Sequence, residues 1–193
     1  MSVLTQNYPD YICAPDGTHI PIDTDFRVWV DFAQTAEQDD IDEQKAADIF
    51  SRIFLGALPS DIDVLIPAVL GFFAPEHLKQ KAASGGGSIK RIIDFDIDSG
   101  RIYAAFLTQY SIDLSTARLH WWAFCSLFNS LSDDTKLVQI MQYRNMTYGE
   151  INKMADKQQR NFYRRMKHIY DLPQNISAKD KEQALVDALS AAF

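Results

Sequence analysis

The most apolar stretch of the chain lies near its middle. Within the thirteen residues 119–131, two adjacent tryptophans, Trp121 and Trp122, stand with two phenylalanines and three leucines. Side chains of this size stay out of water only when both sides of the helix that carries them are covered. The pattern therefore predicts a central helix, from about residue 115 to residue 131, in an all-α core.

Apolar residues also recur at helical spacing before this stretch. Residues 23–25 supply a cap for a first helix, and the carboxylates of residues 39–43 favour the start of a second, a reading preferred over ligand binding. Ser60 and Asp63 begin a third, in which Pro67 either kinks the helix or opens a separate short one. The predicted core positions are Phe26, Trp29, Val30, Ala33, Ala46, Ile49, Phe50, Ile53, Phe54, Ala57, Ile62, Leu65, Ile66, Val69, Leu70 and Phe73.

A pair of strands is predicted ahead of these helices. Within residues 8–22, Asp16 and Gly17 stand between short apolar runs, which is the pattern of a β-hairpin with a two-residue turn. Pro15 and Pro21 exclude a central place in a larger sheet. The predicted fold is mainly α, a helical bundle with a small N-terminal β-hairpin.

Further helices are predicted in the C-terminal half. Asp98 or Ser99 caps one, residues 132–134 cap another, and Gly149 and Asp156 mark breaks. Beyond Asp156 comes a basic helix that Pro173 ends. In this helix Phe162, Met166, Ile169 and Tyr170 form the predicted apolar stripe, while Arg160, Arg164, Arg165 and Lys167 point elsewhere.

The last residues have the pattern of a short amphipathic helix. Ser177 begins it, and Leu185, Leu189 and Phe193 share one face. This helix docks either on the protein's own body, which is favoured, or on a partner. The candidate partner-binding residues are Leu185, Leu189, Phe193, Arg160, Arg164 and Arg165.

A glycine-rich segment at residues 82–88 divides the chain. Lys90 comes too late, and no strand precedes it, for a phosphate-binding loop, so the segment matches a flexible linker. The predicted organisation is a hairpin in residues 1–23, an N-terminal helical lobe in 24–83, a linker in 84–96, a C-terminal helical lobe with the tryptophan-rich helix in 97–173, and the terminal helix in 174–193.

Charge is distributed unevenly along the chain. The net charge is −7, yet residues 1–98 carry 17 acids against 7 bases, and residues 99–193 carry 9 acids against 12 bases. Between Lys136 and Lys167, eight bases face only Glu150 and Asp156, which keeps a DNA-binding hypothesis open. The acidic total and the lack of a recognisable helix-turn-helix pattern argue against that hypothesis.

No strong pattern for catalysis appears in the sequence. The four histidines are isolated from one another and the two cysteines are far apart, which argues against a zinc site or a disulfide. His120 is the best single candidate for a catalytic group, although a hydrogen-bonded position at the edge of the core fits it better. We therefore expect a protein without enzymatic activity, cofactor or metal.

Two other patterns bear on metal binding and on the location of the protein. Asp94, Asp96 and Asp98 resemble the start of a calcium loop, but Ser99 and Ala105 stand where that loop needs glycine and glutamate. No run approaches the ~20 apolar residues of a membrane span, and no secretory signal opens the chain. A cytosolic protein is expected.

Several blocks of the sequence resemble a family of tailed-bacteriophage proteins. They are residues 102–106, 110–114, 119–124, 133–135 and 143–144, together with the opening residues 22–27. The resemblance covers about residues 8–173 and is most specific at the block His120-Trp121-Trp122. The acidic segment, the glycine-rich segment and the residues after Pro173 depart from it. This family is encoded in the tail module of siphophages and prophages of Gram-positive bacteria, next to the tape-measure protein.

The resemblance implies a tail assembly chaperone or a closely associated assembly factor. Such a protein coats the long, largely helical tape-measure protein until tail subunits polymerise around it. The implied partners are the tape-measure protein and other tail assembly proteins, with self-association left open, and the implied location is the host cytoplasm during phage assembly. The alternative is a structural tail protein, a minor tail or tail-completion component retained in the virion.

Overall fold

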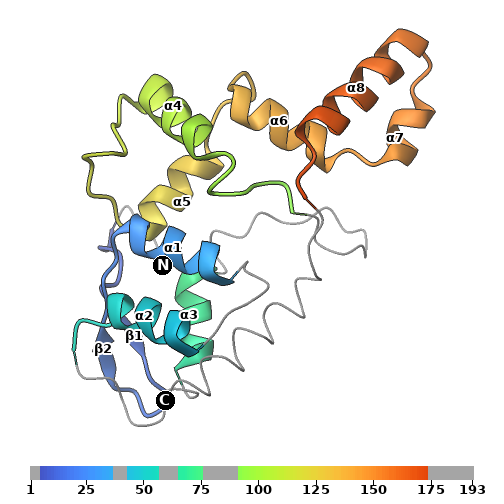
Figure 1. Ribbon diagram of the computed structural model, residues 1–193. Coiled ribbons are helices and arrows are strands. Elements are labelled where there is room, and N and C mark those ends of the chain that lie inside the picture. The colour runs from blue at the N-terminus through green and yellow to red at the C-terminus, as the bar shows by residue number, and fades with distance from the viewer. Residues whose placement is uncertain (1–4, 37–42, 57–64, 76–90, 174–193) are drawn as a thin grey trace. The chain divides into compact units, whose positions relative to one another are not determined.

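The computed structural model describes residues 5–36, 43–56, 65–75 and 91–173 (Figure 1). It confirms the predicted fold class, because this part of the chain is mainly helical with one two-stranded antiparallel hairpin near the N-terminus. None of the helices in these ranges is long and apolar enough to cross a membrane. The elements are β1 (Tyr11–Cys13), β2 (His19–Pro21), α1 (Phe26–Ala36), α2 (Glu43–Ile53), α3 (Ile66–Phe73), α4 (Ser99–Tyr110), α5 (Trp121–Asn129), α6 (Lys136–Asn145), α7 (Tyr148–Lys153) and α8 (Lys157–Tyr170).

The chain forms two compact units. In its described part, the first unit holds the hairpin, α1, α2, α3 and the segment Arg118–Leu127, and the second holds residues 91–117 and 128–173. The tryptophan-rich segment thus belongs with the N-terminal elements, whereas the sequence pattern assigns it to a lobe spanning 97–173. Of the predicted linker, residues 84–90 lie outside the described residues and residues 91–96 belong to the second unit. The predicted terminal helix at 174–193 also lies outside them.

Hydrogen bonds explain why the tryptophan-rich segment packs in the first unit. The indole N–H of Trp121 donates to the Phe73 carbonyl and that of Trp122 to the Phe72 carbonyl, each at 2.8 Å. Both carbonyls lie in the last turn of α3, where a helix offers them no backbone donor. The two tryptophans therefore complete the end of a helix nearly fifty residues earlier in the chain.

Helix α5 is shorter than the predicted span of residues 115–131. The backbone before it is extended, because the Phe26 N–H donates to the Leu119 carbonyl (2.9 Å) and the Trp121 N–H donates to the Thr24 carbonyl (2.7 Å). Asp25 and His120 form an antiparallel bridge between the same two segments. These amide groups cannot also join a helix, so α5 begins only at Trp121.

The hairpin differs from prediction in its turn. The Gly17 N–H donates to the Ala14 carbonyl (2.9 Å), and the Ala14 N–H donates to the Thr18 carbonyl (2.8 Å). The connection is therefore a three-residue loop rather than a two-residue turn. Pro15 sits at the second position of the turn, which its fixed φ favours, and Gly17 has φ +85°, where a side chain would be strained.

The helical stripes of the first unit are buried largely as their spacing predicts. Trp29, Phe50 and Ile53 have almost no exposed surface, while Val30, Leu70 and Phe73 are only half-buried. Phe32 and Phe72 are buried although the predicted stripes do not include them. Pro67 lies in the first turn of α3, so it opens this helix rather than kinking one. Of the predicted positions, Ala57, Ile62 and the acidic run at 39–42 lie outside the described residues.

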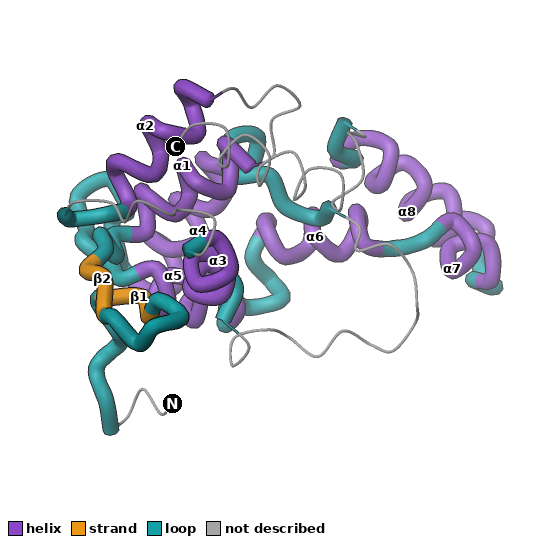
Figure 2. The backbone as a smooth tube through the Cα atoms, turned by 90° about the horizontal axis from the view of Figure 1, so that it is seen from below, coloured by secondary structure: helices purple, strands orange, loops and turns teal. Residues whose placement is uncertain are grey.

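Side-chain caps set the starts of three helices in the second unit. The Thr135 hydroxyl accepts from the Val138 N–H and begins α6, one residue beyond the predicted cap at 132–134. Thr147 and Glu150 form a capping box for α7, so Gly149 lies inside a helix that the sequence pattern does not predict. Asp156 caps α8 as a predicted break. Figure 2 shows α7 and α8 side by side, joined by a short turn.

Replacing Trp122 with phenylalanine tests the bond between α5 and α3. The variant keeps an aromatic ring near Phe72 but leaves the Phe72 carbonyl without its indole donor. The free energy of unfolding should fall by about 1–3 kcal/mol, measured by urea denaturation. Tyr148→Phe, which removes a hydroxyl from an exposed side chain, serves as the control and should change it by less than about 0.5 kcal/mol. Equal stability of the two variants would contradict this role for the indole.

Candidate functional site

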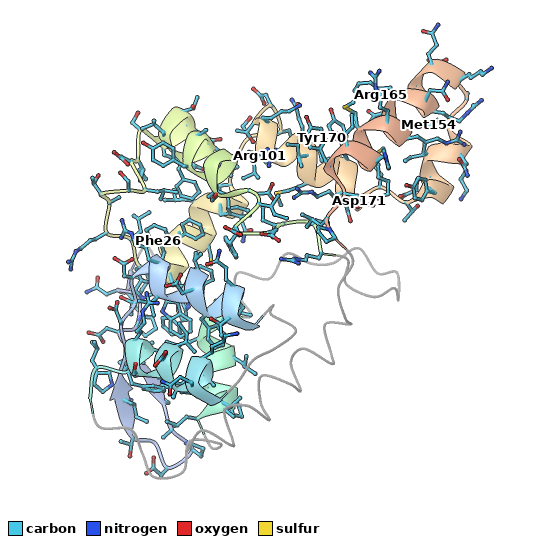
Figure 3. All side chains as sticks on the ribbon, in the orientation of Figure 1. Phe26, Arg101, Met154, Arg165, Tyr170 and Asp171 are labelled. Carbon is cyan, nitrogen blue, oxygen red and sulfur yellow. The ribbon has the colours of Figure 1, made fainter. Side chains whose placement is uncertain are left out.

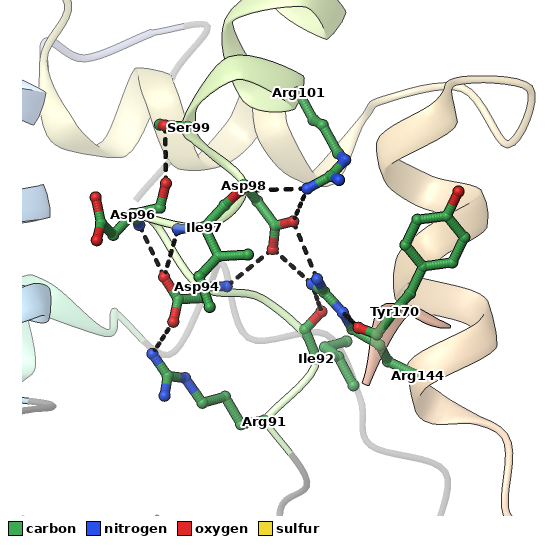
Figure 4. A network of polar contacts seen from close by, with 10 residues as sticks. All are labelled: Arg91, Ile92, Asp94, Asp96, Ile97, Asp98, Ser99, Arg101, Arg144 and Tyr170. Carbon is green, nitrogen blue, oxygen red and sulfur yellow. Dashed lines mark hydrogen bonds and ion pairs between the residues drawn. The ribbon is translucent and has the colours of Figure 1, made fainter. Parts of the chain in front are cut away.

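An ion pair shielded from solvent lies in the second unit (Figure 4). Asp98 is 0% exposed and Arg144 is 1% exposed. Arg144 Nη1 donates to Asp98 Oδ2 at 2.5 Å, and Arg144 Nη2 donates to Asp98 Oδ1 at 3.1 Å. Two such bonds match the planar guanidinium to the planar carboxylate. Asp98 immediately precedes α4 and Arg144 lies in the last turn of α6, so the pair joins these helices.

Arg144 also reaches α8. Its Nε donates to the Tyr170 carbonyl at 2.6 Å, and its Nη1 donates to the Ile92 carbonyl at 3.1 Å. In return, Lys167 Nζ donates to the Arg144 carbonyl at 2.8 Å. Carbonyls in the last turn of a helix lack backbone donors and lie at its negative end, which favours cations there. The two side chains therefore hold the C-terminal ends of α6 and α8 together.

Two of the three alternating acids that resemble a calcium loop, Asp94 and Asp98, are matched by the protein's own donors. Asp94 Oδ1 accepts from the N–H groups of Asp96 and Ile97, each at 2.8 Å, and its Oδ2 accepts from Arg91. Asp98 is the first residue before α4, as predicted, but its carboxylate makes no bond to the N–H groups of that helix. Within the described ranges, no group of three or more His, Cys, Asp or Glu residues is placed to hold a metal ion.

The helical periodicity of the sequence contains a signal for the buried cation. Arg144 follows Leu137 by seven residues and Ile140 by four, so it lies on the buried stripe of α6. A charged residue at such a position must find a counter-charge inside the protein. Asp98 at a predicted helix start is that counter-charge, but its distance of 46 residues from Arg144 hides the pairing in the sequence.

Two of the three predicted partner-binding arginines hold α7 against α8. Arg160 Nη1 donates to the carbonyls of Met154 (2.5 Å) and Ala155 (2.9 Å), in the turn after α7. Arg164 donates to the side chain of Asn152 in α7 at 2.6 Å. The remaining predicted partner-binding residues, Leu185, Leu189 and Phe193, lie outside the described residues.

Arg165, the third predicted partner-binding arginine, is exposed on α8 (Figure 3), as is Arg164. Phe162 and Ile169 lie on the same side of the helix as Arg165, three residues before it and four after it, and are 40% and 56% exposed. We call these three residues the outer face of α8. The apolar stripe predicted for this helix therefore does not face the core of the unit, because Ile169 is exposed while Lys167 is buried.

His120 is held by backbone groups on both ring nitrogens. Its Nδ1 accepts from the Trp122 N–H at 3.0 Å, so the proton must lie on Nε2, which contacts the Pro9 carbonyl at 2.9 Å. The ring stacks on Tyr8, with centroids 4.8 Å apart. This geometry is that of a structural clasp between the N-terminal segment and the start of α5, and it leaves neither nitrogen for a substrate.

Cys125 shows no sign of a reactive thiol. Burial raises the pKa of this cysteine to about 12, so the thiolate needed for nucleophilic chemistry does not form near neutral pH. Cys13 is exposed on the hairpin.

Comparison with known proteins places most of the chain in one family. The family described as Bacteriophage Gp15 protein matches residues 10–172. No curated protein and no solved structure matches the chain. The matched range covers the hairpin and all of the helices described above.

Removing the Asp98 carboxylate tests whether the ion pair stabilises the second unit. Asp98→Ala leaves the buried guanidinium of Arg144 without its counter-charge, so we expect a loss of about 3–5 kcal/mol in the free energy of unfolding. All three tryptophans lie in the first unit, so tryptophan fluorescence reports on that unit and circular dichroism on the whole chain. The dichroism transition should move to lower urea concentration.

The matched control is Arg101→Ala. Arg101 also pairs with Asp98, at 2.9 Å, but its side chain is 37% exposed, so its loss should cost less than about 1 kcal/mol. If Asp98→Ala is no more destabilising than Arg101→Ala, the buried pair does not hold the second unit.

The clasp at His120 predicts a loss of stability at acid pH. Burial lowers the pKa of His120 from its ordinary value of 6.5, opposed by the Pro9 carbonyl and by Asp10. In the unfolded chain the imidazole takes up its proton near pH 6.5, so protonation favours unfolding. The stability that neutral His120 contributes is therefore present above this pH. It is lost as the pH falls toward the pKa of His120 in the folded state. His120→Phe should therefore lose less stability than the wild type between about pH 7.5 and about pH 5.5 in urea titrations.

The exposed His168 provides the control for this pH experiment. His168→Gln removes an exposed imidazole instead of the half-buried one, and so controls for the loss of a histidine as such. A His120→Phe variant with the wild-type pH profile would rule out the clasp.

Proposed function

Because the chain belongs to the Bacteriophage Gp15 protein family, we propose that it is a phage tail assembly factor, a chaperone that binds the tape-measure protein while the tail is built. It would act in the host cytoplasm together with other tail assembly proteins. The role needs no catalytic group, metal or cofactor. Its support comes from the family, from the resemblance to tail-module proteins and from one exposed surface.

That surface, the outer face of α8, is the observation that carries the proposal. Phe162 and Ile169 expose large apolar side chains two helical turns apart, with Arg165 between them. A long helical client needs its apolar stripe covered until its permanent partners assemble, and helical binders recognise such stripes through apolar contacts at this spacing. A structured helix with an apolar, basic outer face is suited to that task.

The blocks that carry the resemblance have identifiable structural roles. His120, Trp121 and Trp122 join α5 to the N-terminal segment and to the end of α3. Tyr143 packs against the aromatic rings of α8, and Arg144 bonds to the end of that helix. The resemblance therefore reflects the scaffold of each unit, and the residues at 143–144 support the helix that presents the outer face.

The proposal is tested by co-expression with the tape-measure protein encoded in the same gene cluster. Affinity purification of the tagged chain should recover the tape-measure protein, and sizing should show several copies of the chain on each client. The soluble yield of the client should rise as its apolar stripes are covered. A tagged coiled-coil protein of unrelated sequence replaces the client in the control and should not be recovered.

Mass spectrometry of purified virions tests the alternative, a structural tail protein that stays in the particle. A chaperone leaves the particle when tail subunits replace it, so its peptides should be absent from finished tails. Failure to associate with the tape-measure protein, combined with presence in the virion, would overturn the proposal and indicate a structural tail protein.

A further inference from the structure

The charge on α8 is of one sign. The helix carries five bases, Lys157, Arg160, Arg164, Arg165 and Lys167, and no acid. The two acids that precede α8 are used in capping: Glu150 in α7 accepts from the N–H and hydroxyl of Thr147, and Asp156 accepts from the N–H groups of two residues at the start of α8. The next acid, Asp171, follows the last residue of the helix. A ligand that complements the exposed bases of α8 therefore carries negative charge.

We propose that the outer face of α8 binds a partner helix that carries an apolar stripe flanked by carboxylates. This inference deepens the proposed function and rests on it for the partner's identity as a phage assembly protein, but the partner's chemistry follows from α8 itself. Phe162 and Ile169 enter the apolar stripe, and Arg165 pairs with a carboxylate beside it.

The spacing of the outer face fits a helix. Phe162 and Ile169 are seven residues apart, about 10 Å along the helix axis, which is the repeat of an apolar stripe on a facing helix. Both side chains expose much of their surface, at 40% and 56%. One exposed apolar residue is ordinary, whereas two on one side of a helix around a cation form a contact surface.

Nucleic acid fits this helix less well. Phosphate tracking needs a row of cations directed outward, but Arg160, Arg164 and Lys167 donate to atoms of α7, of the turn after it and of α6. Lys157 and Arg165 are the remaining bases of α8. The chain as a whole carries a net charge of −7, which repels a polyanion.

The helix that presents the face is held on its other side. Lys167 and Arg144 exchange hydrogen bonds between α8 and α6, and Arg160 and Arg164 tie α8 to α7. Phe162 of the outer face also contacts Tyr143 of α6, with the two rings nearly perpendicular and their centroids 6.1 Å apart. A helix positioned in this way needs little ordering when a partner binds, so more of the contact energy contributes to affinity.

The probes are two synthetic helical peptides of about 20 residues with the same leucine stripe, one flanked by glutamates and one by lysines. Binding of the full chain to each labelled peptide is followed by fluorescence anisotropy at about 0.1 M salt. The glutamate peptide should bind at least about tenfold more tightly than the lysine peptide, because only it complements Arg165.

Two variants separate the apolar and the charged parts of the face. Ile169→Ser should weaken binding of the glutamate peptide about tenfold, and Arg165→Glu should reverse the preference toward the lysine peptide. Leu55→Ser, at an apolar residue of the first unit that is 63% exposed, is the matched control and should bind as the wild type does. Circular dichroism melting confirms that each variant folds.

The inference is overturned if both α8 variants bind the glutamate peptide as tightly as the wild type. It is also overturned if duplex DNA displaces the peptide at low salt, which would assign the face to nucleic acid. Co-purification with the tape-measure protein tests the inference and the proposed function separately. Equal recovery of the tape-measure protein by the wild type and by Arg165→Glu would contradict the inference alone. The predicted reversal of peptide preference without any association with the tape-measure protein would contradict the proposed function alone.

Discussion

The second unit depends on the guanidinium of Arg144. A buried cation loses its hydration, and this cost is offset only when acceptors surround it with good geometry. Asp98 supplies two of these acceptors, and the carbonyls of Ile92 and Tyr170 supply others. Because these partners come from the segment before α4 and from the end of α8, satisfying one side chain brings three helices to fixed positions. The apolar contacts of the unit pack around that arrangement.

Both units supply hydrogen-bond donors to the carbonyls at the ends of their helices, and each unit uses different residues. The carbonyls at the end of a helix have no donors within the helix, and here side chains from other elements provide them. Indole N–H groups of α5 complete α3, Lys167 donates to the end of α6, Arg144 to the end of α8, and Arg160 to the turn after α7. Helices of six to fourteen residues are too short to be stable alone, so these bonds and the apolar contacts act together.

Because many of these cations bond within the protein, the basic C-terminal half does not by itself indicate a basic surface. Counting bases between residues 136 and 167 suggests a surface for an acidic ligand, yet Arg144 and Lys167 are buried and Arg160 and Arg164 bond to the protein itself. Among the exposed residues of α8, which also include Lys157 and Arg164, Arg165 lies between two exposed apolar side chains. A surface of that kind favours an amphipathic helix over a polyanion, which agrees with the function proposed above.

Local sequence patterns are enough to predict the fold class, the hairpin, most core positions of α1, α2 and α3, and the break at Asp156, because each depends on residues within a few positions of one another. Local pattern also contained the capping box at Thr147 and Glu150. It could not show that α5 begins only at Trp121, that the tryptophan-rich segment joins the first unit, or which side of α8 is outward. Those features depend on donors and acceptors far apart in the chain, such as Thr24 with Trp121 and Asp98 with Arg144. They become evident once the fold is known, because a buried polar group must bond to whichever partner the fold brings within reach.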